Sequence, residues 1–288
     1  MTGYQEPNSL LLIDNNGKTT FFVRERDSYR ELWDGYRTGT TKVISEFSID
    51  ESHNIESAKD FLPNLLSKYD TIFFDNNVNS SLSKLVNESI STPKSMYNIN
   101  SLLSSLRLIK TSSEIELMKQ SCRIAAESMI ECMKATKPGI SEKVIEATME
   151  YNCKIRGAQR LSYPPVVASG INANTLHYIT NDMLLEDGQL LLMDAGCEFH
   201  GYSSDITRSW PINGQFTSPQ LDIYNIVLNA NKKCIDHCRI SNDVSLRDIH
   251  NVALDVLKTG LIQLGILNSN QITSVYIYFR YFNVNFNF

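Results

Sequence analysis

The sequence predicts two successive domains, an α/β domain followed by an α+β domain in which helices pack on an antiparallel sheet. Three observations carry this prediction. An Asn-Gly turn between apolar runs opens the chain, strand-like and helical stretches then alternate, and four periodic helices accompany the apolar strand that begins at Leu190. With 288 residues, 42% of them hydrophobic, the chain is long enough to bury two cores.

The first predicted domain opens with a β-hairpin. Two apolar runs, Leu10–Ile13 and Thr20–Val23, flank an Asn-Gly pair at positions 16 and 17. Such a pair between apolar runs is the strongest local signal for a tight hairpin turn. Apolar residues at helical spacing predict a helix over Ile55–Ser67, and Tyr69–Asp75 reads as a further strand. This alternation indicates an α/β layer domain.

The domain boundary is expected after a stretch without clear periodicity. Residues 76–101 are rich in Asn and Ser and weakly patterned, so the first domain is placed at 1–108 and the second at 109–270. Residues 271–288 form an atypical tail, rich in aromatic residues and Asn, that includes "VYIYFRYFNVNFNF". A run this β-prone and apolar is an aggregation liability, and we expect it to be foreign to the native coding sequence.

Four helices are predicted in the second domain from their caps and apolar stripes. Ser113 and Glu116 form a capping box for the first. The second runs from Ser141 to about Cys153, the third over Thr217–Arg239, and the fourth from Ser245 to about Gly265. Together with the strands near 163–169, 190 and 206, they give an α+β arrangement on an antiparallel sheet.

Charge and composition exclude several classes of partner. The formal net charge is −5 and the pI is about 5.6, so no basic excess is present to bind nucleic acid or an anionic membrane. No apolar run is long enough to cross a bilayer, and the first residues lack the pattern of a secretory signal. The six cysteines are scattered, as expected for reduced thiols. We therefore expect a protein of a soluble compartment.

Two aspartates mark the most informative stretch, "LLLMDAGCEFHGYSSDITRSW". An apolar strand ends at Asp194, and the chain returns with Asp205. If the hairpin turn is centred on Phe199 and His200, the two aspartates lie directly opposite each other. Opposed Cβ atoms are about 5 Å apart, and two bare carboxylates at that distance repel each other or share a proton. A positive charge is therefore expected between them.

Three interpretations of the aspartate pair remain open on spacing alone. A divalent metal or metal pair could neutralise the carboxylates, because hard oxygen ligands suit Mn, Co, Zn or Fe. Asp194 could instead cap its strand while Asp205 pairs with Arg208, a purely structural role. The pair could also be a general acid/base dyad.

A phosphate-binding loop is excluded in the same stretch. Gly196 to Gly201 has the glycine spacing of such a loop but lacks the Lys-Ser/Thr that would hold phosphate and magnesium.

A resemblance to a known family decides among these interpretations. "LLLMDAGCEFHGYSSDITRSWPINGQFT" resembles the metal-binding segment of aminopeptidase P, the Xaa-Pro aminopeptidases of peptidase family M24B. The segments "TGYQEPNSLLLI", "FFVRERDSYRELWDGYRTG", "RLIKTSSEIELMKQSC", "KPGISE" and "YPPVVASGINANTLHYITND" are similar to successive family segments in family order. The mitochondrial branch is the most similar. The resemblance implies a partial creatinase-type N-terminal domain, then a pita-bread (creatinase/aminopeptidase) domain that is incomplete at its C-terminus.

The resemblance also implies a reaction and a set of site residues. In this family two divalent metals, commonly manganese, are held by two aspartates, one histidine and two glutamates around a water that attacks the scissile carbonyl. Asp194 and Asp205 match the aspartates. His177 matches a histidine that contacts substrate near the scissile bond, and Thr207 is expected beside the metal ligands. The implied substrate is a peptide or protein N-terminus with proline at its second position.

Part of this ligand set is missing from the printed sequence. The family's metal-binding histidine and glutamates follow the helix expected at 245–265, yet here no histidine follows His250 and no glutamate follows Glu198. With two of the family's metal ligands, the chain is expected to be inactive alone. The first residues resemble the middle of the family's N-terminal domain, so the sequence is interpreted as a fragment truncated at both ends.

The resemblance also implies a location and an oligomeric state for the protein. The resemblance favours the mitochondrion, with the cytoplasm as the second choice, and it is compatible with a homodimer. The alternative function is a non-catalytic pita-bread protein that binds peptides or proteins. Two facing carboxylates without a metal argue against that alternative, because their repulsion would have no compensation.

Overall fold

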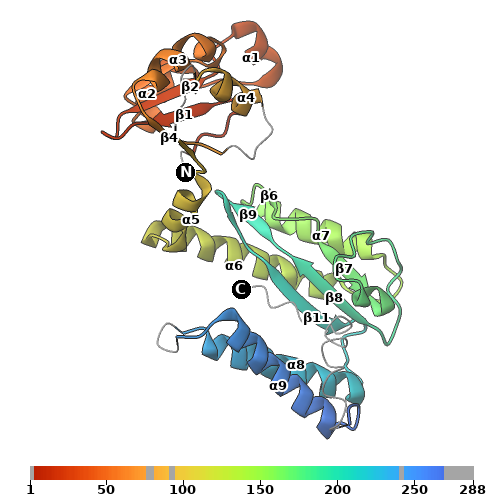
Figure 1. Ribbon diagram of the computed structural model, residues 1–288. Helices are drawn as coiled ribbons and strands as arrows, with labels where there is room; N and C mark the ends of the chain where they lie inside the picture. The colour runs from red at the N-terminus through yellow and green to blue at the C-terminus, as the bar shows by residue number, and fades with distance from the viewer. Residues whose placement is uncertain (1–2, 76–80, 91–94, 240–242, 269–288) are drawn as a thin grey trace. The chain divides into compact units, whose positions relative to one another are not determined.

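The computed structural model describes residues 3–75, 81–90, 95–239 and 243–268 (Figure 1). The chain divides into two compact units, Met1–Ile109 and Lys110–Phe288. The expected aromatic tail, 271–288, lies outside the described residues. All six cysteines are free thiols. Among the described residues, no helix is both long enough and apolar enough to span a bilayer.

The first unit is built on the predicted hairpin. Strands β1 (Leu10–Ile13) and β2 (Thr19–Val23) pair antiparallel, and β3 (Glu51–Asn54) adds to β2 in parallel. The side chain of Asp14 closes the turn by accepting hydrogen bonds from the backbone N–H groups of Asn16 (2.8 Å) and Lys18 (2.9 Å). The predicted hairpin is confirmed, but its turn is longer than a two-residue Asn-Gly turn, because Asn16 does not have the positive φ that such a turn requires. Gly17 adopts the left-handed backbone, φ +81°, and its N–H donates to the Asp14 oxygen at 3.0 Å.

Both faces of β2 are buried, which explains its continuous apolar sequence. Phe22 packs with α3 side chains such as Leu62, whereas Phe21 and Val23 pack on the other face with Val43 of α2. The remaining elements of the unit are α1 (Ser28–Asp34), α2 (Gly39–Phe47), the 3₁₀ turn η1 (Ile55–Ser57), α3 (Ala58–Ser67), β4 (Thr71–Phe73), α4 (Ser81–Glu88), β5 (Ser95–Tyr97) and α5 (Asn100–Leu108). The expected α/β layering and the helix near 55–67 are thus present.

The structure contains elements where the sequence predicted none. Within the weakly patterned stretch 76–101, α4 forms and β5 pairs in parallel with β4. Helix α5 also lacks a side-chain cap at Ile99 and buries no residue. Elements of three to nine residues span too few turns or alternations to stand out from the Asn- and Ser-rich sequence around them, so tertiary contacts contribute much to their formation.

The second unit begins with helices α6 (Ser112–Ala135) and α7 (Glu142–Ile155). The predicted capping box of α6 is wrong by two residues. Thr111, not Ser113, is the N-cap: its hydroxyl accepts from the Glu114 N–H at 3.3 Å, and its own N–H donates to the Glu114 carboxylate at 2.7 Å. The run Thr-Ser-Ser-Glu allows several cap registers, and only the backbone before the helix selects one.

A three-stranded antiparallel sheet forms the centre of this unit, in the order β11-β8-β7. Helices α6 and α7 pack against one of its faces, where Met129 and Met149 meet Leu191, Met193 and Trp210 (Figure 1). The strands are β7 (Val166–Ser169), β8 (Leu190–Ala195) and β11 (Ile206–Pro211), and the smaller strands β6 (Arg160–Leu161), β9 (Cys197–Phe199) and β10 (Tyr202–Ser203) form a second sheet. The predicted antiparallel sheet is confirmed.

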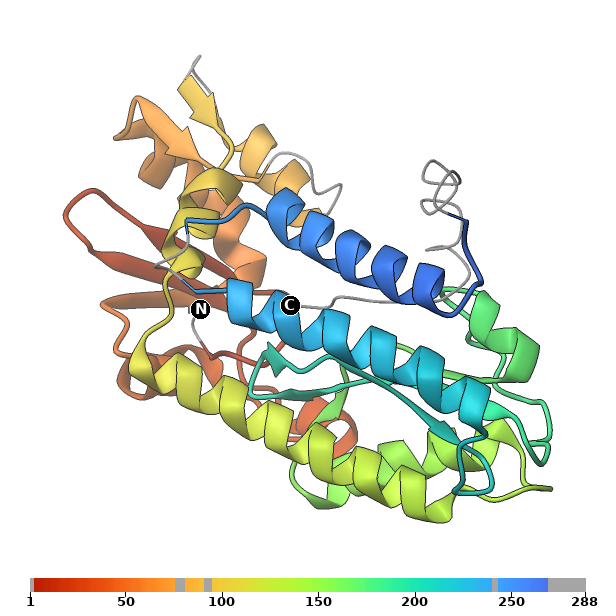
Figure 2. The ribbon, with the colours of Figure 1, turned by 90° about the horizontal axis from the view of Figure 1, so that it is seen from below.

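The last two described helices, α8 (Ser218–His237) and α9 (Leu246–Gln263), pack against each other (Figure 2). The predicted cap of α9 at Ser245 is confirmed. Close approach of the pair depends on small residues, because a Cβ at Gly260 would meet Ile226 at 2.6 Å. Two apolar α8 residues, Leu221 and Ile235, are 43% and 57% exposed, so the buried stripe of α8 is narrow.

Candidate metal centre

The hairpin that carries the two aspartates turns at His200 and Gly201. Both residues have positive φ, +49° and +83°, as a two-residue type I′ turn requires. Strand residue Phe199 stands opposite Tyr202. The sequence expectation of a turn at Phe199 and His200 is therefore wrong by one residue, because glycine tolerates the second left-handed position.

The register of the strands follows from this turn. Asp194 stands directly opposite Thr207 and not opposite Asp205, which corrects the prediction of direct opposition. Even so, the two carboxylates approach each other. The hydroxyl of Tyr163 lies 2.6 Å from Oδ1 of Asp194 and 2.8 Å from Oδ1 of Asp205. One hydroxyl within hydrogen-bond reach of both side chains shows that they meet at a single point.

Close approach of the backbone beside Asp194 positions this point. An added Cβ at Gly196 would lie 1.8 Å from the backbone oxygen of Ser204, so only glycine fits. Neighbouring bonds hold the same backbone: the N–H of Ser162 donates to the Gly196 oxygen at 3.0 Å, and the Ser162 hydroxyl donates to the Ser204 oxygen at 3.0 Å. The carboxylates therefore extend from a tightly packed corner of the sheet.

Burial and like charge make the aspartate pair electrostatically unfavourable. Asp194 is only 5% exposed. Burial raises the pKa of Asp194, the Tyr163 hydroxyl opposes that rise, and the charge of nearby Asp205 adds to it. Burial and the two carboxylates also raise the pKa of Tyr163 far above its usual range. Because the Tyr163 hydroxyl has one proton, it cannot donate to both carboxylates at once, and a cation or a shared proton would relieve their repulsion.

The residues at this point fit a divalent cation. Their donors are carboxylate and hydroxyl oxygens, the ligand type that hard metal ions prefer. The hydroxyl of Thr207 is buried opposite Asp194 and makes no hydrogen bond of ordinary geometry among the described residues, although it lies near enough to help lower the pKa of Asp194. No cluster of three or more His, Cys, Asp or Glu that could hold a metal occurs within the described ranges. Within the described ranges, the candidate ligands predicted from the sequence are thus the two aspartates.

The structural alternative for Asp205 does not match this geometry. Arg208 stands opposite Met193, on the other face of the strand from Asp194, and its guanidinium donates to the backbone oxygen of Thr207 at 2.8 Å. In the part of the chain that the structure describes, Arg208 forms no ion pair with Asp205. The shared Tyr163 contact, rather than a salt bridge, accounts for the position of Asp205.

His177 lies in the connection between β7 and β8. It follows η2 (Gly170–Asn174), in the turn that the Tyr178 N–H closes on the Thr175 oxygen at 3.3 Å, and its side chain is exposed. Among the described residues, His177 makes no hydrogen bond or ion pair. The imidazole is therefore accessible to a ligand, and its proposed contact with substrate stays a prediction.

Comparison with known proteins identifies the family. The model of metallopeptidase family M24 matches residues 116–280, and that of the aminopeptidase P N-terminal domain matches residues 1–73. The chain belongs to metallopeptidase family M24. Membership of this family implies a centre of divalent metal ions. The predicted order of an aminopeptidase P N-terminal domain followed by a pita-bread domain is confirmed.

Relatives of this M24 chain carry the names Xaa-Pro aminopeptidase and intermediate cleaving peptidase. Xaa-Pro aminopeptidase 3 of Rattus norvegicus is 36% identical over 285 residues, which cover 94% of this chain and 56% of the relative. The mitochondrial intermediate cleaving peptidase 55 of Arabidopsis thaliana is 33% identical, covering 94% and 55%. The chain thus spans about half the length of the curated relatives that it matches.

Solved structures of the same family superpose closely on the M24 chain. The aminopeptidase PepP of Pseudomonas aeruginosa has a TM-score of 0.90 and 32% identity, covering 96% of this chain and 65% of that one. Zinc-substituted aminopeptidase P of Escherichia coli in complex with product has a TM-score of 0.91 and 28% identity, covering 96% and 67%. The pita-bread fold predicted from the sequence is therefore confirmed.

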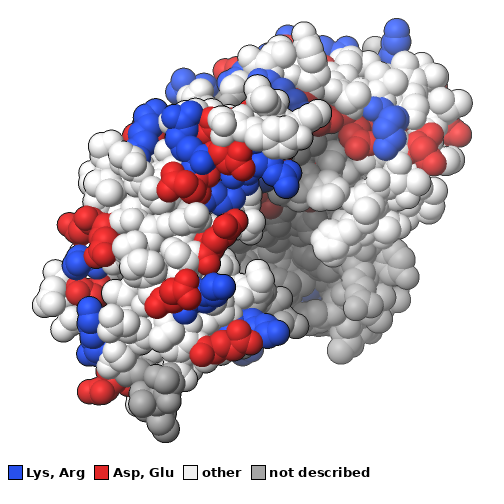
Figure 3. All heavy atoms as spheres, turned by 90° about the horizontal axis from the view of Figure 1, so that it is seen from above, with Lys and Arg blue, Asp and Glu red and all other residues white. Residues whose placement is uncertain are grey.

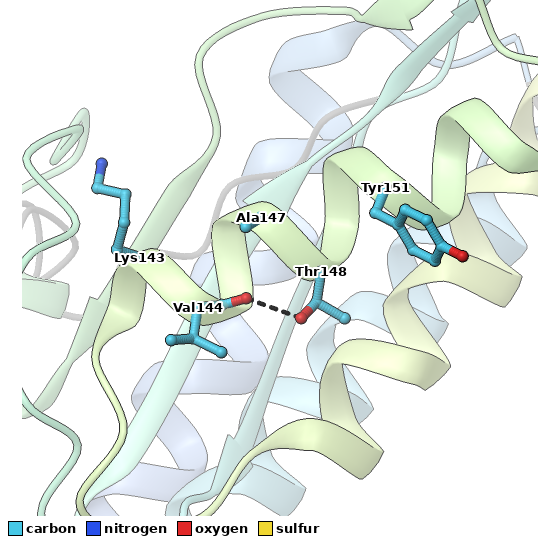
Figure 4. A pocket seen from close by; sticks show the side chains of 5 residues that line it. All are labelled: Lys143, Val144, Ala147, Thr148 and Tyr151. Carbon is cyan, nitrogen blue, oxygen red and sulfur yellow. Dashed lines mark hydrogen bonds between the residues drawn. The ribbon is translucent and has the colours of Figure 1, made fainter.

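The hollow that the structure describes beside α7 does not have the residues of a metal site. The hollow beside α7 is lined by residues of one helix, none of them a carboxylate or an imidazole: Lys143, Val144, Ala147, Thr148 and Tyr151 (Figure 4). On the face drawn in Figure 3, acidic and basic side chains are interspersed. A mixed surface of this kind has no single-sign field to attract nucleic acid.

Two residues of the site region were missed by sequence reasoning. Tyr163 bridges the aspartates, and Glu142 holds the segment that bears His177. Tyr163 precedes two prolines just before a strand, and Glu142 is the first residue of a helix, where an acidic side chain is commonplace. Neither position shows a local signal, because both roles depend on contacts distant in sequence.

Replacing Thr207 by valine should separate metal binding from stability. Valine has nearly the same shape and removes a buried hydroxyl without an ordinary partner, so the free energy of unfolding without metal should change by less than about 1 kcal/mol. Affinity for Mn²⁺ should fall roughly 10-fold if the hydroxyl supports the metal ligands. Chemical denaturation in EDTA and Mn²⁺ titration followed by electron paramagnetic resonance measure the two effects. Unchanged Mn²⁺ affinity would leave Thr207 as an ordinary strand residue.

Proposed function

We propose that the protein acts as a metallo-aminopeptidase that releases an N-terminal residue preceding proline. The supporting observation is the meeting of Asp194 and Asp205 at one hydroxyl, on a hairpin inside the segment matched by the M24 family model. Relatives at 36% identity carry the name Xaa-Pro aminopeptidase. The proposed substrate is a peptide or protein with proline at its second position.

Asp194 and Asp205 would hold the metal ions, which supply an activated water and polarise the scissile carbonyl. Burial of Asp194 keeps bulk water away from the reacting centre and strengthens its charge interactions. Tyr163 orients both carboxylates by hydrogen bonding. His177, exposed on its turn, would contact the substrate near the scissile bond. Manganese is the proposed metal, with cobalt, zinc or iron as alternatives.

The 288-residue polypeptide by itself is proposed to be inactive. The resemblance assigns five protein ligands to the metals, and the printed sequence has no histidine after His250 and no glutamate after Glu198 to supply the remaining ones. Two carboxylates bind a divalent ion weakly. A mitochondrial location is proposed because relatives include a mitochondrial intermediate cleaving peptidase.

A cleavage assay tests the proposal. Protein isolated from its own cells, with its intact mass measured, should release the first residue of an Ala-Pro-Ala peptide in Mn²⁺. It should leave Ala-Ala-Ala intact, and EDTA should abolish the release. The 288-residue polypeptide expressed alone should show no release. Isolated protein that binds the proline peptide without cleaving it would instead favour the non-catalytic binding module.

A further inference from the structure

Glu142, the first residue of α7, is a fully buried carboxylate, 0% exposed. Its described hydrogen-bond donors are all uncharged. A buried carboxylate without a cation costs several kcal/mol unless hydrogen bonds satisfy its oxygens. The N-terminal end of a helix provides part of the compensation, and the rest must come from these donors.

Five donors converge on the Glu142 carboxylate. Oε1 accepts from the N–H and the hydroxyl of Ser169, each at 2.7 Å, and from the Asn172 amide at 3.1 Å. Oε2 accepts from the Tyr178 hydroxyl at 2.8 Å and from the Met183 N–H at 3.1 Å. Burial by itself would raise the pKa of Glu142, but the bonds from Ser169, Asn172 and Tyr178 outweigh it and lower the pKa. The side chain is therefore ionised at neutral pH.

These donors bracket the segment that carries His177. Ser169 and Met183 lie at its two ends, Asn172 lies in η2, and Tyr178 directly follows His177. The ring of Tyr178 also packs against Leu192 and its neighbours. Leu192 lies two residues before Asp194 and so on the same face of β8. The Glu142 contacts thus hold the His177 turn against the face of the sheet that bears Asp194.

Asn181 joins the same segment to α7 and to the start of β7 by hydrogen bonds. Its side-chain oxygen accepts from the Val167 N–H at 3.0 Å, and its amide donates to the Pro165 oxygen at 2.9 Å and to Glu146 at 3.2 Å. Asn181 is fully buried and has a left-handed backbone, φ +50°. Residues 169–183 are thus anchored at both ends, while the His177 side chain itself stays exposed.

We propose that Glu142 is a positioning residue, which holds the segment 169–183 so that His177 faces the substrate beside the metal ligands. The inference rests on the proposed aminopeptidase function for the role of His177. The negative charge is essential to it. A glutamine at this position has one acceptor oxygen, and its amide group would face the Tyr178 hydroxyl and the Met183 N–H. The Tyr178 hydroxyl can turn to accept from that amide, but the Met183 N–H cannot accept, so at least one of the five bonds would be lost and two donors would face each other.

Hydrogen exchange of the 288-residue polypeptide tests whether Glu142 restrains the segment 169–183. In Glu142→Gln, amides within 169–183 should exchange at least about 10-fold faster, with α6 amides unchanged. Glu150→Gln is the matched control, because Glu150 lies on the same helix but is exposed and pairs with Lys154 at 2.7 Å. Exchange at wild-type rates in 169–183, or a uniform increase across the unit, would overturn the proposal.

A double-mutant cycle in the active enzyme tests the link to His177. Glu142→Gln should lower kcat/KM roughly 10- to 100-fold, because a small displacement of a substrate contact has effects of this size. His177→Ala should lower kcat/KM in wild type but change it less than about 2-fold in the Glu142→Gln background. Effects that multiply would show that Glu142 acts through stability alone. Wild-type enzyme that cleaves no Xaa-Pro peptide would refute the proposed function. The hydrogen-exchange result would still show whether Glu142 restrains the segment 169–183.

A milder variant covers the case in which Glu142→Gln does not fold. Tyr178→Phe removes one donor to Glu142 and keeps the ring that packs on Leu192. It should increase exchange within 169–183 by less than Glu142→Gln and show the same non-additivity with His177→Ala. An additive result for this variant would overturn the proposal equally.

Discussion

Replacing Gly196 by alanine should lower the free energy of unfolding by about 4 kcal/mol or more, the range of severe core substitutions. The added Cβ would lie 1.8 Å from the backbone oxygen of Ser204, and real contacts do not approach so closely. Relief would require the strands on either side to separate, because the obstructing atom belongs to the backbone. The corner that holds Asp194 and Asp205 would then be lost. Chemical denaturation at pH 7 measures the effect.

Gly188→Ala is the matched control for this substitution. Gly188 has a left-handed backbone, φ +78°, and no atom lies within 4 Å of its added Cβ. Alanine there should cost only the conformational penalty, about 1–2 kcal/mol. The difference between the two variants isolates the clash. Equal losses would mean that the backbone at Gly196 is not as closely packed as its geometry indicates.

Replacing Asp194 by asparagine should change activity and stability in opposite directions. In the metal-loaded enzyme a lost ligand should lower kcat/KM by about 100-fold or more, since even residues that only support ligands have effects of 10- to 100-fold. Without metal at pH 7, the free energy of unfolding should rise, because a buried charge beside Asp205 is removed and Tyr163 still has an acceptor.

The sign of the stability effect follows from the raised pKa of Asp194. The folded state binds this proton more tightly than the unfolded chain does, so the contribution of Asp194 is fully present below its ordinary pKa of 3.8. That contribution is lost as the pH rises through the higher pKa in the fold. The gain from Asp194→Asn in EDTA should therefore be present at pH 7 and vanish near pH 3. A loss of stability at pH 7 would contradict the repulsion.

Asp222→Asn is the control for Asp194→Asn. Asp222 is an exposed aspartate of α8. Its replacement should leave kcat/KM unchanged and the free energy of unfolding within about 0.5 kcal/mol of wild type. If both variants lost activity equally, Asp194 would have no special part in catalysis.

Register errors show where sequence reasoning about the site reached its limit. The hairpin turn was placed at Phe199 and His200, one residue early, and the capping box of α6 two residues late. Each stretch offers several neighbouring residues of suitable type, and the choice among them depends on the backbone of the flanking elements. Asp194 and Asp205 nevertheless meet, because a turn displaced by one residue shifts the pairing by two and preserves the side of the strand.

The sequence by itself determined the strong local elements and the presence of two aspartates close together in the chain. The Asn-Gly hairpin, the capped helices α7 and α9, the apolar strand β8 and the two aspartates after it follow from periodicity, turn chemistry and residue type. Only the tertiary structure decided which groups meet the carboxylates. Tyr163 reaches Asp194 and Asp205, and Glu142 collects donors from Ser169 to Met183, because folding brings together segments 27 to 42 residues apart. Contacts over such separations depend on packing and leave no periodic trace in the chain.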